Sequence, residues 1–386
     1  MFESICIKSN LSNNQKIDFS LLINAMLFYN DVNLFVHESE LTLLLEKFGV
    51  ELLAELINIG RIKLHIRQNT FGIASQFDEN KSLYGVGCFS KNDDSVHGVL
   101  YRAHRKIVNN SSKNNKFADR FSYIVSSHSF PNEEVVKEIM DDFQSSEYLN
   151  EAVKEYLKFN YPSYCLQYPL EFNVERITNN DFPWESVRVH SNLDFAKLTD
   201  LDKEKGYNSP FNYGGLLLTL GESRCDNYLS ANFSSDLITD QRFSKIISLQ
   251  LKNSIRQTDY DLQQIELFNN HVLCDCPQLG DAFFEKVIST RQFIEILEKG
   301  DKWRTWLNSQ PNNADLIGAY ISEVTKETMA DNKLIKIGRF ILSCFMQNPV
   351  VASIYNVFDS LYIDKLLTGW KPNHYIQDEL VSRLKA

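Results

Sequence analysis

Three residues with acid–base or anion-binding side chains follow consecutive predicted strands near the N-terminus. His37 and Glu38 come directly after the apolar run Val32–Val36, and Arg67 ends the run Ile62–Arg67. In open α/β proteins, ligands bind beyond the carboxyl ends of parallel strands. A histidine beside a carboxylate can act as a general acid or base, and a guanidinium can clamp an anion. The sequence therefore predicts a catalytic site of His37, Glu38 and Arg67; alternatively, the first two merely begin a helix and Arg67 is solvated.

A basic cluster on a predicted helix is the second candidate. Arg102, Arg105 and Lys106 lie within the helical pattern His97–Val108. Such a cluster can bind the phosphate of a nucleotide, although a solvated helix face has the same composition. No Gly-rich phosphate loop follows any predicted strand, so we expect neither a dinucleotide site nor another cofactor.

Metal chemistry has weaker support in the sequence. His271, Cys274 and Cys276 form an H-x-x-C-x-C pattern, but a structural zinc site needs four ligands and the usual C-x-x-C pairs are absent. Buried thiols are the favoured interpretation, and no metal site is predicted. A Mg²⁺-dependent nuclease would need several carboxylates at the strand ends, where Glu38 alone is well placed.

The elements that must position these residues begin with an α/β unit. Three strand-like runs, Ser4–Lys8, Val32–Val36 and Ile62–Arg67, are separated by helical patterns. Asp18–Tyr29 forms the first of these, and a helix from about Ser39 followed by a second helix, Val50–Asn58, lies before the third strand. Glycines at positions 49 and 60 fall where helices should end, because such positions often need a positive φ. This order predicts a βαβαβ parallel sheet with right-handed crossovers. Two further strand-like runs within Thr70–Ser90 are expected to extend that sheet as a hairpin.

Beyond the sheet the pattern changes twice, and we predict three regions. Residues 1–130 form an α/β domain, 131–212 a mixed α+β connecting region, and 213–386 a helical domain. Within the connecting region, Glu171–Ile177 and Ser186–His190 alternate apolar and polar residues, as a half-buried antiparallel pair does. The fold class is thus α/β plus all-α.

An uncharged run from Phe340 to Phe358 lies in the predicted helical domain. Its length could cross a bilayer, but Pro349 at its midpoint removes a backbone donor, and lipid could not satisfy the freed groups. We therefore predict a buried apolar hairpin of two helices, Leu334–Met346 and Val350–Leu367. Membrane contact is expected only conditionally, after this domain opens.

The amino-acid composition limits which binding partners and which cellular compartment we expect. The net charge of −10 and the pI of about 5.4 argue against nucleic-acid binding, which depends on neutralising phosphates. Seven cysteines, an odd number spread along the chain, do not resemble a secreted disulfide framework, and the N-terminal residues lack a signal peptide's apolar core. We expect a cytoplasmic bacterial protein with a protein partner or a homo-oligomeric state; the sequence leaves any small ligand undefined.

Three C-terminal segments resemble the C-terminal half of a group of uncharacterised bacterial proteins. They are Phe293–Leu307, Ile317–Met329 and Asp359–Tyr375, and the last matches the ending D-S-x-x-x-D-K-L-L-x-G-W-x-P-N. This chain departs from that group in lacking a glycine between Phe340 and Phe358, so helix packing that depends on glycine is not expected here. The resemblance implies no activity.

Three functional hypotheses follow. The first is a non-enzymatic effector or sensor, in stress or phage defence, with an α/β recognition domain coupled to a helical domain. The second is a hydrolase or nuclease at the carboxyl edge of the sheet, which requires His37, Glu38 and Arg67 to converge. The third is a scaffold that binds another protein through its helices.

Overall fold

The computed structural model describes most of the chain. The described residues are 2–8, 17–75, 83–90, 95–166, 168–177, 184–207, 211–238, 246, 254–273, 277–311, 314–325 and 371–385. The predicted hairpin with its uncharged run, and two of the three candidate zinc ligands, Cys274 and Cys276, lie outside these residues. Among the described helices, none combines the length and apolar character needed to cross a membrane.

A five-stranded parallel sheet contains the predicted βαβαβ unit and confirms it. Its strands lie in the order β6 (Ser126–His128), β3 (Lys63–Arg67), β2 (Asp31–Val36), β1 (Ser4–Lys8) and β9 (Asp236–Ile238). All four neighbouring pairs are parallel. Helix α1 (Phe19–Phe28) connects β1 to β2, and α2 (Glu38–Asn58) connects β2 to β3.

Glycine permits two sharp changes of direction around α2. Gly49 has a φ of 75° and interrupts the helical backbone, and Gly60 has a φ of 74° just beyond the helix end. Both positions were expected to need a positive φ, which glycine adopts without the steric cost of a Cβ.

A second, antiparallel sheet combines strands from two of the predicted regions. Its order is β4 (Thr70–Ser75), β5 (Leu83–Phe89), β8 (Glu185–Ser191) and β7 (Phe172–Ile177). The predicted β7–β8 pair is therefore confirmed. The expectation that the β4–β5 hairpin extends the parallel sheet is wrong, because β6 occupies the edge of β3 that the hairpin would have needed.

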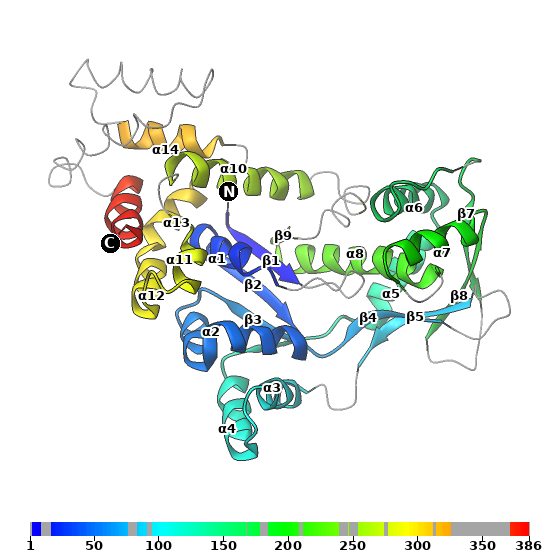
Figure 1. Ribbon diagram of the computed structural model, residues 1–386, viewed down its shortest axis with the longest axis horizontal. Helices are drawn as coiled ribbons and strands as arrows, with labels where there is room; N and C mark the ends of the chain where they lie inside the picture. Colours follow the sequence, from blue (N-terminus) through cyan, green and yellow to red (C-terminus); the bar gives the residue numbers. More distant parts are fainter. Residues whose placement is uncertain are drawn as a thin grey trace.

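Helices cover both sheets and fill the connections (Figure 1). The remaining helices before β9 are α3 (Val96–Arg105), α4 (Ser111–Ser122), α5 (Asn132–Gln144), α6 (Ser146–Asn160), α7 (Phe195–Glu204) and α8 (Tyr213–Phe233). After β9 come α10 (Ser254–Val272), α11 (Leu279–Phe284), α12 (Thr290–Lys299), α13 (Asp301–Asn308) and α14 (Leu316–Thr325). The C-terminal helix comprises a π-helical stretch, η5 (His374–Val381), and α17 (Ser382–Leu384).

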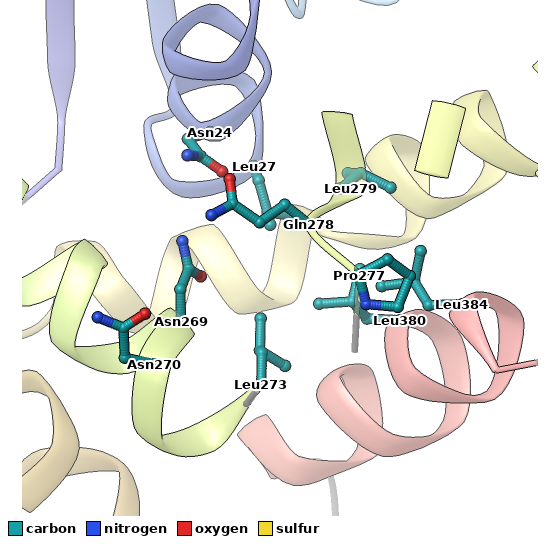
Figure 2. Close-up of a pocket in the computed structure, with 10 residues that line it drawn as sticks. All are labelled: Asn24, Leu27, Asn269, Asn270, Leu273, Pro277, Gln278, Leu279, Leu380 and Leu384. Atoms are coloured by element: carbon teal, nitrogen blue, oxygen red, sulfur yellow. The ribbon is translucent and has the colours of Figure 1, made fainter. Parts of the chain in front are cut away.

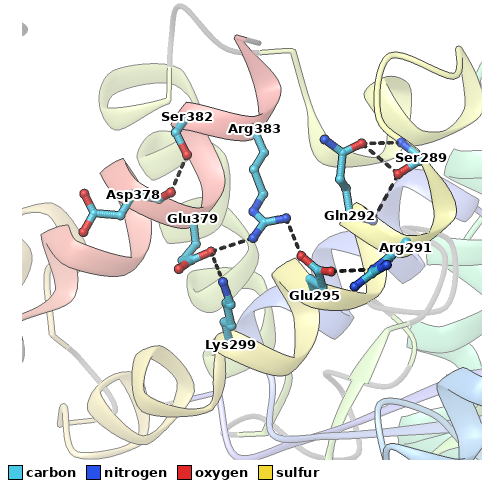
Figure 3. A network of polar contacts seen from close by, with 9 residues as sticks. All are labelled: Ser289, Arg291, Gln292, Glu295, Lys299, Asp378, Glu379, Ser382 and Arg383. Carbon is cyan, nitrogen blue, oxygen red and sulfur yellow. Dashed lines mark hydrogen bonds and ion pairs between the residues drawn. The ribbon is translucent and has the colours of Figure 1, made fainter.

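Ion pairs join the C-terminal helix to α12 (Figure 3). Arg383 lies 2.7 Å from a carboxylate oxygen of Glu295, and the Lys299 ammonium lies 2.8 Å from that of Glu379. Beneath them the buried Tyr375 hydroxyl donates to the Ile296 carbonyl at 2.9 Å. Besides its apolar packing, the helix is thus joined to α12 by a buried hydrogen bond and by partly exposed ion pairs.

The two faces of the parallel sheet belong to different cores. One core contains α1, α2 and the helices α10–α14 with the C-terminal helix, and it receives Ile5, Leu34 and Ile66 from the strands. The other contains α5, α6 and α8, and it receives Cys6 and Phe35. Residues alternate between the faces because successive side chains of a strand point in opposite directions.

Helix α8 runs from the antiparallel sheet to the parallel sheet (Figure 1). It contacts β4 on one side and both β1 and β9 on the other. At the β4 contact the Phe71 ring lies against Gly221, so closely that a Cβ at this glycine would be 2.1 Å from a ring carbon. Since α8 and β9 both lie within 213–386, contacts between the regions cross the predicted boundary at 212.

We expect Gly221→Ala to destabilise the protein by about 1–3 kcal/mol, because an added methyl group in a filled site forces backbone or ring displacement. Urea unfolding monitored by circular dichroism measures this change. Gly215→Ala on the same helix is the matched control: its nearest neighbour would be the Tyr156 hydroxyl at 3.7 Å, an ordinary contact. That control should be neutral or stabilising, since alanine favours helix over glycine by about 1 kcal/mol. Equal effects of the two substitutions would contradict this packing.

Candidate functional site

The face of the parallel sheet that lies under α8 is polar and buried. The opposite face presents only aliphatic side chains from the three central strands, whereas this face carries six buried residues that are polar, ionisable or thiol-bearing: Cys6, Lys8, Asn33, His65, Arg67 and His128. Burying such groups costs free energy unless each is paired or hydrogen-bonded. Their partners therefore define what this face can do.

Lys8 ends β1 and is paired with α8. Its ammonium lies 2.7 Å from a carboxylate oxygen of Asp226, and both side chains are almost fully buried. Burial alone would lower the pKa of Lys8, but Asp226 and the nearby Glu222 together raise it above the ordinary value. Lys8 is thus held as a cation between the sheet and the helix.

Arg67 ends β3 and is only partly satisfied. The guanidinium lies 3.5 Å from Oε1 of Glu40. The other carboxylate oxygen of Glu40, Oε2, accepts hydrogen bonds from the His37 backbone N–H and the Ser39 hydroxyl. Although Arg67 is 1% exposed, its Nε has no hydrogen-bond partner within the described part of the chain. A buried N–H without an acceptor is uncommon, and each such group invites an explanation.

His128 lies beside Arg67 on the neighbouring strand. The two residues are register partners in the β3–β6 pair, and the His128 Nε2 is also buried, with no hydrogen-bond partner in the ranges that the structure describes. Burial, reinforced by the Arg67 charge, lowers the pKa of His128 to about 4. The imidazole is therefore neutral near pH 7 and can donate or accept one hydrogen bond.

Aromatic rings separate this pair from the rest of the face. Phe35 stacks on His65 with ring centroids 4.6 Å apart, and Phe233 of α8 contacts Phe35, His65 and His128. The His65 Nε2 lies 3.2 Å from the Asn33 side-chain oxygen. Burial, with smaller contributions from His128 and Lys63, lowers the pKa of His65 to about 4. Both histidines are neutral members of a packed aromatic layer.

The predicted triad residues lie at this edge but make separate contacts. Glu38 accepts from the Arg102 guanidinium at 2.8 Å and lies 2.8 Å from the Lys106 ammonium. Burial would raise the pKa of Glu38, yet these two cations lower it below the ordinary value. Arg67 is instead paired with Glu40, and His37 is the N-cap residue of α2.

The predicted anion-binding cluster is divided in the same way. Arg102 and Lys106 are one helical turn apart on α3 and both engage Glu38, whereas Arg105 is exposed. Residues four apart lie on one helix face, which is why a single carboxylate can reach both cations. This arrangement joins α3 to the start of α2, and a phosphate at Arg102 or Lys106 would have to compete with Glu38.

Three of the described cysteines are buried or half-buried thiols, and Cys165 is exposed. Burial raises the pKa of the Cys6 and Cys88 thiols to about 12, and that of Cys225 well above its ordinary value. A protonated thiol is a poor nucleophile. Within the part of the chain that the structure describes, no three His, Cys, Asp or Glu side chains are grouped as metal ligands.

The strand order also indicates a ligand site at the carboxyl edge of the parallel sheet. The chain moves from β1 through β2 and β3 to β6 in one direction, and then returns to place β9 on the other side of β1. In open α/β sheets, ligands bind outside the carboxyl ends of the strands where the order reverses in this way. Lys8 stands at that position, and Arg67 and His128 end strands further along the same edge.

Sequence reasoning found Arg67 but missed Lys8, Glu40, Asp226 and His128. Lys8 gave a usable signal, since it ends a predicted strand just as Arg67 does. Asp226 and Glu222 gave none, because an acidic residue on a helix more than two hundred residues away is ordinarily solvated.

Comparisons with protein-family models, with curated proteins and with solved structures find no match for this chain.

Acid should destabilise the protein through its buried histidines. In the unfolded chain a histidine takes up a proton near its ordinary pKa of 6.5, whereas folded His65 and His128 do so only at about 4. The unfolded state thus binds more protons in this window, so stability falls as the pH drops from about 6.5 to about 4. The loss is up to about 3 kcal/mol for each histidine, at about 1.4 kcal/mol per unit of pKa.

Urea unfolding across that window measures the effect. His128→Phe should remove about half of the acid sensitivity, because it deletes a titrating group whose Nε2 has no partner. His190→Gln, at an exposed histidine paired with Glu175, should leave the acid sensitivity intact. A pH profile unchanged by His128→Phe would show that this histidine titrates normally.

Proposed function

We propose that the protein is a non-enzymatic effector or sensor that recognises a small ligand at the carboxyl edge of its parallel sheet. One observation carries the proposal: Arg67 and His128 stand side by side, nearly inaccessible, and neither the Arg67 Nε nor the His128 Nε2 has a hydrogen-bond partner among the residues that the structure describes. An acceptor oxygen between these groups would satisfy the Arg67 N–H and a His128 N–H. A carboxylate or phosphate oxygen is the strongest acceptor for a guanidinium.

The surrounding charges favour reversible binding of such a group. The Arg67–Glu40 contact is long for a hydrogen-bonded ion pair, at 3.5 Å, so the guanidinium keeps capacity for a second oxygen. Lys8, in contrast, is paired with Asp226 at 2.7 Å and held as a cation by the nearby Glu222, so it has a countercharge without the ligand. Recognition therefore centres on Arg67 and His128.

The contacts made by α8 support a coupled response. Asp226 ties this helix to β1 and Phe233 packs on His128, while Gly221 packs on Phe71 of the second sheet. A ligand that displaces His128 or Arg67 therefore acts on an element shared by both sheets. Such a link between recognition and a second structural region is what a sensor requires.

A hydrolase or nuclease is the less favoured alternative. A general base works best with a pKa near the working pH, but two cations lower the pKa of Glu38. The buried thiols are protonated, and the described residues contain no grouped metal ligands. A protein-binding scaffold fits the helical region equally well but gives no role to the unsatisfied Arg67.

The expected setting is a bacterial cytoplasm, in stress or phage defence, with a protein partner or a second copy of the chain receiving the signal. Membrane contact belongs to this proposal only as a conditional event, and nucleic acid is not an expected ligand because of the acidic net charge.

The full chain should be stabilised by inorganic phosphate or acetate more than by chloride of equal ionic strength. A ligand at a hundredfold excess over its Kd adds about 2.7 kcal/mol. Arg67→Met with Glu40→Gln should abolish this stabilisation without leaving an unpaired buried charge. Arg120→Met with Glu51→Gln, which removes an exposed ion pair, is the matched control. Thermal unfolding measures all three proteins.

The proposal fails if neither anion outperforms chloride for the unaltered chain, or if the double variant responds as the control does. A preference for phosphate over acetate would identify the ligand group. Release of p-nitrophenol from its phosphate or acetate ester, lost in the Arg67 variant, would instead establish the hydrolase alternative.

A further inference from the structure

A hollow lined by carboxamides lies on the opposite side of the parallel sheet from α8. Figure 2 shows it between α1, α10, the segment before α11 and the C-terminal helix. Its volume is about 230 Å³, and a second hollow of about 210 Å³ adjoins it. Both are far larger than the space one water molecule needs, and smaller than a typical drug-binding cavity.

Four side-chain amides from three elements converge on the boundary between the two hollows. Asn24 comes from α1, Asn269 and Asn270 from α10, and Gln278 directly precedes α11; all four line both hollows. Figure 2 shows Asn24 and Gln278 pointing toward one another. Asn24 and Asn269 are half-buried and Asn270 and Gln278 are exposed, and none of the four amides is hydrogen-bonded to another side chain or backbone group among the residues that the structure describes. Each can both donate and accept.

An aliphatic wall continues from this amide cluster. In the larger hollow it consists of five leucines and a proline: Leu27, Leu273, Pro277, Leu279, Leu380 and Leu384. None of the ten lining residues in Figure 2 is charged or aromatic. A ligand there meets a neutral polar end and an apolar end.

These features select one chemical class. Moving a carboxylate into this hollow would remove it from water without supplying a countercharge, and the adjoining hollow contributes the acidic Glu266. A nucleobase would be bound more effectively with an aromatic ring to stack on, and the described residues that line the larger hollow include none. A carboxamide group with a short alkyl chain satisfies both ends at once.

We propose that this hollow is a binding site for a neutral aliphatic amide. The ligand's carboxamide pairs with Asn24, Asn269 and Gln278, and its alkyl chain lies against Leu380 and Leu384 of the C-terminal helix. The site is separate from the Arg67–His128 edge, because α1 and α8 cover opposite faces of the sheet. A failure of the proposed function would therefore leave this amide site unaffected, and the reverse also holds.

Binding should also stabilise the position of the C-terminal helix. Two of the apolar contacts come from that helix, whose ionic attachment to α12 is partly exposed and weakened by salt. An alkyl chain that bridges α1 and Leu380 adds apolar burial, which salt does not screen. Slower hydrogen exchange in this helix would therefore report binding independently of the calorimetric titration.

Hexanamide is the probe for the neutral amide class. Hexanoate tests the carboxylate alternative, and adenine tests the nucleobase alternative. Calorimetric titration of the full chain should show binding of hexanamide, with hexanoate and adenine each at least tenfold weaker. Asn24→Ala with Asn269→Ala should weaken hexanamide binding about tenfold or more, since each hydrogen bond contributes about 0.5–1.5 kcal/mol. Gln263→Ala, at an exposed residue of α10 that lines neither hollow, should bind as the unaltered chain does.

Hydrogen exchange of the C-terminal helix should slow when hexanamide is added at high salt. Hexanoate binding as tightly as hexanamide would overturn the neutral class, and tighter adenine binding would replace it with a nucleobase. No binding of any probe at millimolar concentration, or equal binding by the double variant and the control, would rule out the site.

Discussion

The buried ion pair between Lys8 and Asp226 is the constraint on which the arrangement of the two sheets depends. A lysine that ends a central strand of a covered sheet cannot reach water, so a carboxylate must be brought to it. Asp226 fulfils this requirement from α8. Breaking such a pair from one side costs about 3–5 kcal/mol, because the remaining charge stays buried. The position of α8, and with it the antiparallel sheet at its other end, follows from this charge.

The need to pair buried polar groups also distinguishes the two faces of the parallel sheet. Strands covered by helices on both sides usually carry apolar residues throughout. Here the face toward α1 obeys that rule, whereas the face toward α8 holds cations, histidines and an asparagine. Polar burial of this kind does not improve stability over an apolar layer. Under the proposed function, this polar layer is the recognition surface, and Arg67 is its incompletely paired residue.

Local patterns were sufficient to predict the α/β unit and the β7–β8 pair. Short apolar runs with glycines at the helix ends specify strands and turns within a few residues of themselves. The placement of β4–β5 and β9 was not accessible in the same way. Each depends on which sheet edge is already occupied, and β9 pairs with a strand more than two hundred residues earlier. For the site, Arg67 was predictable because it ends a strand, but its partner Glu40 was indistinguishable from Glu38 in the sequence.

Pairing of β9 with β1 also has a consequence for the order in which the protein can be made. Ile5 and Ile7 of β1 lie beside Asp236 and Ile238, so this edge of β1 stays without its strand until residue 238 has left the ribosome. At about 5–20 residues per second, the interval between the two strands is on the order of ten to fifty seconds. During that time an apolar strand edge is open to other chains. Nascent-chain chaperones therefore have a defined segment to shield, and truncations before β9 should aggregate.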